Sequence, residues 1–115
     1  DYQLTEYFDH VILFDELHQK NSDLSYNEFQ CMIYANCDKF VSYVGGGGIL
    51  SSYFGGTNIM WTSRGKEVRP GYLDKNSYYH KLSDCNVIPI FDKENTYPHR
   101  IENYQELLET IRREF

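Results

Sequence analysis

The chain has 115 residues, the size of one domain, and its 41% hydrophobic and 24% charged residues are close to the averages of globular proteins. This composition argues against a disordered, collagenous or membrane-spanning chain. The formal net charge is −6, so the chain lacks the basic face that nucleic-acid binding requires, and we expect no nucleic-acid partner. A phosphorylated small molecule can still bind through backbone amides.

Three cysteines, Cys31, Cys37 and Cys85, form no Cys-x-x-Cys pair, and their odd number argues against a disulfide framework. We expect free thiols and a cytoplasmic location. The sequence shows no signal peptide and no apolar run long enough to span a membrane. Because the chain begins with Asp1 rather than Met, we expect a fragment of a larger two-domain protein that lacks the N-terminal domain.

The first third of the chain predicts one strand and one helix. The apolar segment 8–14 predicts a buried strand, with the start of a helix as the alternative, and the polar residues 15–24 predict a loop. Ser25 and Glu28 have capping-box spacing, which predicts the start of a helix over residues 26–36.

The middle of the chain predicts two strands around a short helix. A β-branched and aromatic segment predicts a strand at 39–44, and it runs into four consecutive glycines at 45–48. A short helix at 49–54 is expected next, closed by a glycine pair at 55–56 that suits a left-handed cap. A further strand is predicted at 57–62.

The last part of the chain predicts a loop, a strand and a helix. Residues 63–83 predict a long loop, with a small helix near 78–82 as the alternative. A strand is predicted at 86–91, a polar connection at 92–101 and an amphipathic helix at 103–115. This alternation predicts a single α/β domain over residues 1–115, a Rossmann-like three-layer sandwich with a mostly parallel sheet.

The glycine run between a strand and a short helix is the most informative motif. Glycines at such a turn let a ligand approach the backbone, and the helix N-terminus offers unpaired N–H groups and a favourable dipole to an anion. Four consecutive glycines cost considerable backbone entropy without a function, which favours a phosphate or diphosphate site over a simple turn. A dinucleotide site is disfavoured, because Ser51 follows where glycine or alanine is expected and the helix is short.

The stretch LSYNEFQCMIYANCDKFVSYVGGGGILSSYFGGTNIMWTSRG resembles the nucleotide-sugar-binding half of GT-B glycosyltransferases, with a layout most similar to the heptosyltransferase-like families. In those families a capped helix ends in an Ala-x-Cys/Ala-Asp step, here residues 35–38, before a strand and a small-residue turn. Gly55 and Gly65 match the glycines that follow the short helix and the next strand. The sequence departs from the pattern at Val44 and Ile49, where those families usually carry an acidic residue and a histidine.

The resemblance implies a glycosyltransferase domain that moves a sugar from a nucleotide-sugar donor to a sugar or glycan acceptor. We expect no metal and no cofactor, because the four histidines lack ligand-pair spacing and a helix N-terminus can neutralise the leaving diphosphate. The acceptor site, and often the catalytic base, belong to the N-terminal domain in such enzymes, so we identify no catalytic residue. The alternative is a non-catalytic module that binds a nucleotide or a sugar phosphate.

The resemblance and the turn together predict a donor-diphosphate site. Its expected residues are Gly45, Gly46, Gly47, Gly48 and Ser51, and further candidates are Ser52, Arg64, Lys66 and Tyr79. Each candidate outside the glycine run has a structural alternative. The serines could cap the helix or pack against the sheet, the basic residues could lie on a solvated loop, and the tyrosine could be buried.

Overall fold

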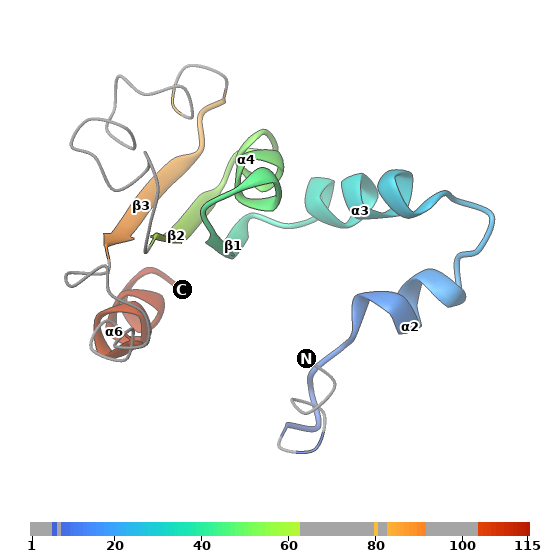
Figure 1. Cartoon of the computed structure of the whole chain (residues 1–115), viewed down its shortest axis with the longest axis horizontal. Helices are drawn as coiled ribbons and strands as arrows, with labels where there is room; N and C mark the ends of the chain where they lie inside the picture. Colours follow the sequence, from blue (N-terminus) through green and yellow to red (C-terminus); the bar gives the residue numbers. More distant parts are fainter. Residues whose placement is uncertain (1–5, 7, 63–79, 81–82, 92–103) are drawn as a thin grey trace. The chain divides into compact units, whose positions relative to one another are not determined.

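The computed structural model describes residues 6, 8–62, 80, 83–91 and 104–115 (Figure 1). The chain divides into two compact units, Asp1–Asn36 and Cys37–Phe115, which are described separately below. None of the helices that the structure describes is long and apolar enough to cross a membrane.

The first unit contains two helices, α2 (Phe14–Gln19) and α3 (Tyr26–Ala35). Their rings form one aromatic cluster, in which the Phe14 ring lies 4.7 Å from that of Tyr26 and 5.2 Å from that of Phe29. His18 joins the cluster, and its Nε2 lies 2.9 Å from the carbonyl oxygen of Leu24. The connection between the two helices is therefore held by both ring packing and a hydrogen bond.

The strand predicted at 8–14 is wrong, and the loop predicted at 15–24 is wrong in its first part, because α2 begins at Phe14. Phe14 and His18 are one helical turn apart, so a helix lets both rings join the aromatic cluster. Asp15 and Glu16 lie in the first turn, where acidic side chains favour a helix. The apolar run therefore leads into a helix instead of pairing in a sheet.

The capping box predicted before α3 is confirmed. The Ser25 hydroxyl accepts the backbone N–H of Glu28 at 3.4 Å, and the Glu28 carboxylate accepts the backbone N–H of Ser25 at 2.9 Å. The Ser25 hydroxyl also donates to this carboxylate at 2.6 Å, and these bonds lower the pKa of Glu28. The predicted helix ends at Ala35, with Asn36 as its C-cap.

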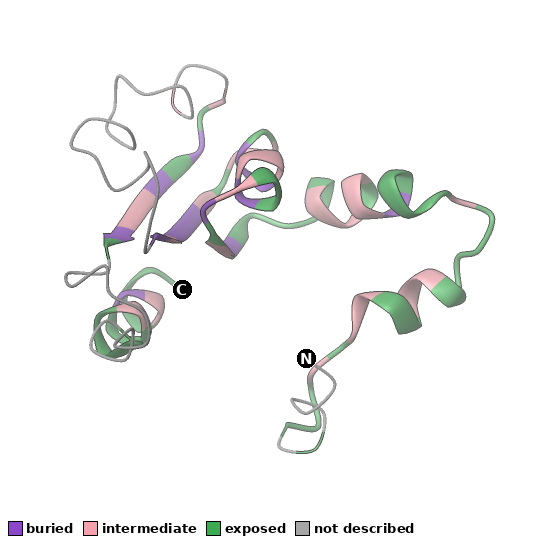
Figure 2. Cartoon of the chain, in the orientation of Figure 1, coloured by how far each residue is buried: buried purple, intermediate pink, exposed green. Residues whose placement is uncertain are grey.

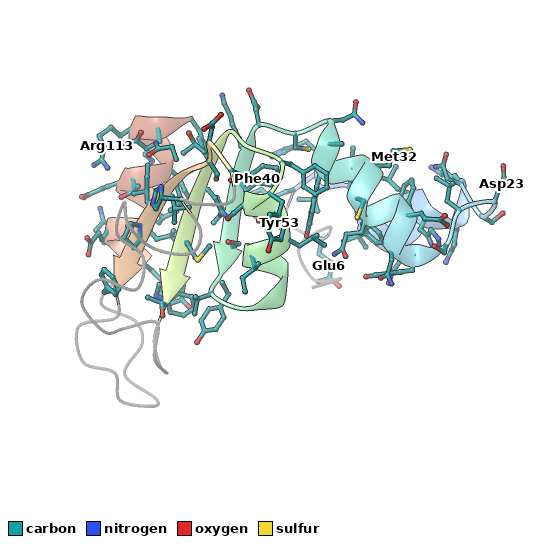
Figure 3. The ribbon with its side chains drawn as sticks, turned by 90° about the horizontal axis from the view of Figure 1, so that it is seen from above. Glu6, Asp23, Met32, Phe40, Tyr53 and Arg113 are labelled. Carbon is teal, nitrogen blue, oxygen red and sulfur yellow. The ribbon has the colours of Figure 1, made fainter. Side chains whose placement is uncertain are left out.

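The second unit contains an open, all-parallel sheet of three strands in the order β1 (Lys39–Tyr43), β2 (Thr57–Thr62) and β3 (Asn86–Phe91). Figure 3 shows the three arrows side by side and pointing the same way. The parallel pairing and the three strand positions confirm the predicted Rossmann-like α/β fold.

Helices α4 (Gly46–Ser52) and α6 (Tyr104–Glu114) cover opposite faces of this sheet (Figure 1). Because side chains alternate along a strand, even-numbered residues of β1 and β2 face α4 and odd-numbered residues face α6. The α4 side holds a core of Val44, Met60, Cys85 and Val87, against which Ile49 packs. Ile59 and Ile90 are buried as well. In Figure 2, the buried residues concentrate on the strands and α4, whereas α2 has none and α3 has one.

The glycine pair after α4 has a left-handed backbone, with φ of 81° at Gly55 and 70° at Gly56, but it does not cap the helix as predicted, because α4 ends at Ser52 with Tyr53 as its C-cap. A Cβ at Gly56 would lie 2.2 Å from the carbonyl oxygen of Asp38, so only glycine fits there. The same Asp38 carbonyl accepts the backbone N–H of Thr57 at 2.8 Å. This close approach sets the start of β2 beside the start of β1.

Candidate functional site

The glycine run lies at the carboxyl end of β1, where ligands bind in open parallel sheets. The predicted short helix starts three residues too late, because Gly46, Gly47 and Gly48 are the first residues of α4 itself. Gly45 is the N-cap and has a φ of 153°, a backbone angle that residues with a side chain rarely adopt. Its carbonyl accepts the N–H of Ile49 at 2.9 Å. The glycines therefore form the first turn of the helix instead of a loop before it.

The first N–H groups of a helix have no carbonyl partner inside that helix. In α4 these groups belong to Gly46, Gly47 and Gly48. A Cβ added at Gly46 or Gly47 would meet no described residue within 4 Å, so the space beside these two residues is open. This part of the turn can be approached closely by a ligand.

Gly48 has a packing role instead. A Cβ at this position would lie 2.9 Å from the carbonyl oxygen of Tyr43, 3.0 Å from the Ser42 hydroxyl and 3.3 Å from the Met60 methyl group. The absence of a side chain lets α4 lie directly on β1 and β2. Gly48 was predicted as a diphosphate ligand from the glycine run and the family resemblance, and this contact with the sheet gives an independent reason for glycine.

The side chain of Asn58 is fully buried and links β1, β2 and α4. Its Oδ1 accepts the Ser42 hydroxyl at 2.8 Å. Its Nδ2 lies 3.2 Å from the Gly48 carbonyl oxygen and 3.0 Å from the hydroxyl oxygens of Ser51 and Ser52. This network holds residues 45–48, which we call the glycine turn, against the sheet. The sequence-based predictions did not include Asn58.

Ser51 and Ser52 both have 2% relative exposure, and their hydroxyls belong to this network. Each hydroxyl donates to the Gly48 carbonyl oxygen, Ser51 at 3.1 Å and Ser52 at 2.8 Å, and accepts from Asn58. Both hydroxyls therefore have protein partners, which agrees with the structural alternative for the serines, namely packing against the sheet, and not with phosphate binding. In this arrangement neither hydroxyl proton is available to a phosphate.

Thr62, the last residue of β2, has 0% exposure and lies on the α4 side of the sheet by its position in the strand. The Oγ1 atom of Thr62 is buried and has no hydrogen-bond partner among the residues that the structure describes. Buried hydroxyls are nearly always paired, so an unpaired one at the carboxyl edge of the sheet points to a missing partner. Thr62 was not among the predicted site residues, although a hydroxyl at the end of a buried strand could have indicated it.

Three predicted residues, Arg64, Lys66 and Tyr79, lie outside the residues that the structure describes. The long loop or small helix at 63–83 and the connection at 92–101 also fall wholly or largely outside them. Within the described ranges, no cluster of three or more His, Cys, Asp or Glu side chains could hold a metal ion.

The three cysteines are free thiols. Cys31 is half-buried and Cys85 is buried, whereas Cys37 is exposed because it follows the end of α3. Burial raises the pKa of the Cys85 thiol, with a smaller opposing effect of its hydrogen bond to Ser52. Cys85 is therefore a neutral core residue and not a nucleophile.

Comparisons with protein-family models, with curated proteins and with solved structures find no match to this chain.

Proposed function

We propose that this chain binds the diphosphate of a nucleotide-sugar donor at the carboxyl edge of its sheet, as part of a GT-B-type glycosyltransferase. The resemblance of residues 24–65 to the donor-binding half of such enzymes motivates the choice of donor. The proposal includes a sugar or glycan acceptor, an N-terminal domain in the whole protein and a cytoplasmic location.

The proposal depends on two features at the carboxyl edge of the sheet: glycine N–H groups that a ligand can approach, and a side-chain hydroxyl without a hydrogen-bond partner among the described residues. Gly46 and Gly47 begin α4 with open space beside them, and Thr62 ends β2 with its Oγ1 unpaired among the described residues. An anion at this edge would accept hydrogen bonds from the amides and from the hydroxyl. The helix dipole adds a favourable interaction with its negative charge.

The chemical contribution of this site is electrostatic. Sugar transfer from a nucleoside diphosphate leaves negative charge on the departing diphosphate, and fixed N–H donors stabilise that charge in the transition state. The Asn58 network would keep these donors in place, because it fixes the Gly48 carbonyl to β2. In this proposal, Gly48, Ser51 and Ser52 support the turn, while Gly46 and Gly47 contact the ligand.

A second candidate is a nucleotide-binding or sugar-phosphate-binding module without transferase activity. Val44 and Ile49 favour it, because they replace the acidic residue and histidine that related donor sites usually carry. Both side chains belong to the apolar core on the α4 side of the sheet and offer no titratable group. A transfer assay on the whole protein separates the two candidates, since both predict nucleotide binding.

Calorimetric titration of the chain with UDP, GDP and ADP tests the binding site. We expect at least one nucleotide to bind, and Gly47→Val to weaken binding at least tenfold, because its bulk occupies the open space beside the turn. The matched control is Tyr53→Val at the exposed C-terminal end of the same helix, labelled in Figure 3, which should leave the affinity unchanged. If none of the three nucleotides binds, or if both variants bind equally well, the proposed site is wrong.

A further inference from the structure

Three aromatic side chains, Tyr43, Trp61 and Tyr104, gather on the face of the sheet opposite α4. Tyr43 and Trp61 are register partners near the carboxyl ends of β1 and β2, and their rings meet edge to face with centroids 5.3 Å apart. Tyr104 is the first residue of α6, and its ring lies 5.6 Å from that of Trp61. We call these three residues the aromatic platform.

The two tyrosines of the aromatic platform are exposed, whereas Trp61 between them is half-buried. Tyr43 has 39% relative exposure and Tyr104 has 48%, whereas Ile59 and Ile90 have 0% and 3% on the same face of the sheet, where Ile90 is the register partner of Trp61. The buried isoleucines, together with Thr110 of α6 at 3%, already provide a core between the sheet and the helix. The two tyrosines therefore leave aromatic surface in contact with solvent at the edge where parallel sheets bind ligands.

The aromatic platform adjoins the glycine turn across this edge. Tyr43 precedes the N-cap Gly45 by two residues, and its carbonyl oxygen lies 2.9 Å from the position of a Cβ on Gly48. The side chain of Tyr43 is at an odd-numbered position and therefore points to the α6 face of the sheet. The glycines that begin α4 lie on the opposite face. The edge thus offers amide donors on one side and aromatic rings on the other.

We infer that the aromatic platform stacks the nucleobase of the nucleotide whose diphosphate lies at the glycine turn. This inference rests on the proposed function. A nucleoside diphosphate joins a charged group and a planar aromatic base through a ribose, so its two ends match the two sides of the edge. Aromatic side chains stack on any base through the face of the ring, which makes the aromatic platform suited to a nucleobase.

Trp61 is the only tryptophan in the sequence, so its fluorescence reports directly on the aromatic platform. The test titrates the whole chain with UDP, GDP and ADP, and in parallel with inorganic pyrophosphate and with ribose 5-phosphate. A stacked base should quench Trp61 emission at the same concentrations at which calorimetry detects binding. Pyrophosphate should bind, because it shares the diphosphate, but should leave the emission unchanged.

A pair of variants separates stacking from a structural role. Tyr104→Leu keeps apolar contact with Trp61 but removes the ring, and we expect a loss of nucleotide affinity of roughly tenfold with unchanged pyrophosphate affinity. Tyr104→Phe retains the ring and should bind nucleotides like the original chain. Thermal unfolding of both variants shows that the comparison is made on folded protein.

The outcomes distinguish the two ideas. If pyrophosphate and nucleotides bind equally tightly without quenching, or if Tyr104→Leu changes only stability, the base does not stack here and the diphosphate site stands. Quenching by ribose 5-phosphate to the same extent as by nucleotides would assign the aromatic platform to a sugar and overturn the inference. If neither pyrophosphate nor any nucleotide binds, both the inference and the proposed function are wrong.

Discussion

The side-chain amide of Asn58 in β2 donates a 3.2 Å hydrogen bond to the carbonyl oxygen of Gly48 in α4. This bond joins the fully buried centre of the sheet to the turn that begins the helix. Asn58 thereby holds in place the residues to which we assign diphosphate binding.

Asn58→Ala should destabilise the second unit by about 3 kcal/mol, because it removes one hydrogen-bond partner from each of three hydroxyls and one from the Gly48 carbonyl oxygen. Ser42 loses its acceptor, and Ser51 and Ser52 lose a donor. Chemical denaturation measures the change in the free energy of unfolding. Asn86→Ala is the control, since this asparagine is exposed at the start of β3 and should change stability by less than about 0.5 kcal/mol. Equal effects of the two substitutions would contradict the role of the network.

Two neighbouring glycines should respond to alanine in opposite directions. Gly48→Ala places a Cβ 2.9 Å from the Tyr43 carbonyl oxygen and should cost about 1–3 kcal/mol. The Cβ that Gly47→Ala adds would meet no described residue within 4 Å. This substitution should stabilise the helix by about 0.5–1 kcal/mol, because alanine loses less backbone entropy than glycine on folding. Thermal unfolding of the two variants checks the signs. A stabilising Gly48→Ala would show that α4 does not pack this closely on β1.

Thr62→Val should raise the stability of the chain without ligand by about 1 kcal/mol, because it replaces a buried, unpaired hydroxyl with a methyl group of similar size. The same variant should weaken nucleotide binding, since the ligand loses one hydrogen-bond donor. Denaturation and calorimetric titration of the variant test both effects. A loss of stability without ligand would mean that the hydroxyl has a protein partner.

The capping box makes the first unit sensitive to acid. The pKa of Glu28 is lowered in the folded state, so the unfolded chain protonates this carboxyl at a higher pH than the folded chain does. The stabilisation is present above the ordinary glutamate range and is lost as the pH falls through the lowered value. An NMR titration of the Glu28 carboxyl should show this lowered pKa, and Ser25→Ala should raise it toward its ordinary value. An identical pKa in both proteins would exclude the hydrogen bond of the Ser25 hydroxyl as the cause.

The sequence predicted the parallel sheet because each strand segment is β-branched, apolar and separated from the next by turn residues. It predicted α3 well because Ser25 and Glu28 form a local motif that needs no distant contact. The segment 8–14 was misread because an apolar run has no periodicity of its own, and the ring contacts of Phe14 with α3 favour a helix.

The site was predicted only in part. The position of the glycine run at the carboxyl end of β1 followed from local pattern. Gly48, Ser51 and Asn58 meet through contacts between elements, which no single segment encodes. Thr62 could be identified as a candidate only from the structure, which shows that its side chain is buried and that its Oγ1 is unpaired among the described residues.

The most direct test of the central claim is an NMR titration of the isotope-labelled chain with UDP, GDP and ADP. If the diphosphate lies at the glycine turn, the amide resonances of Gly46 and Gly47 should shift most, and those of Thr62 should follow. Tyr53, at the other end of α4, should shift little. If the nucleotides shift a different surface, or leave the turn unchanged at millimolar concentration, the glycine turn is not the diphosphate site.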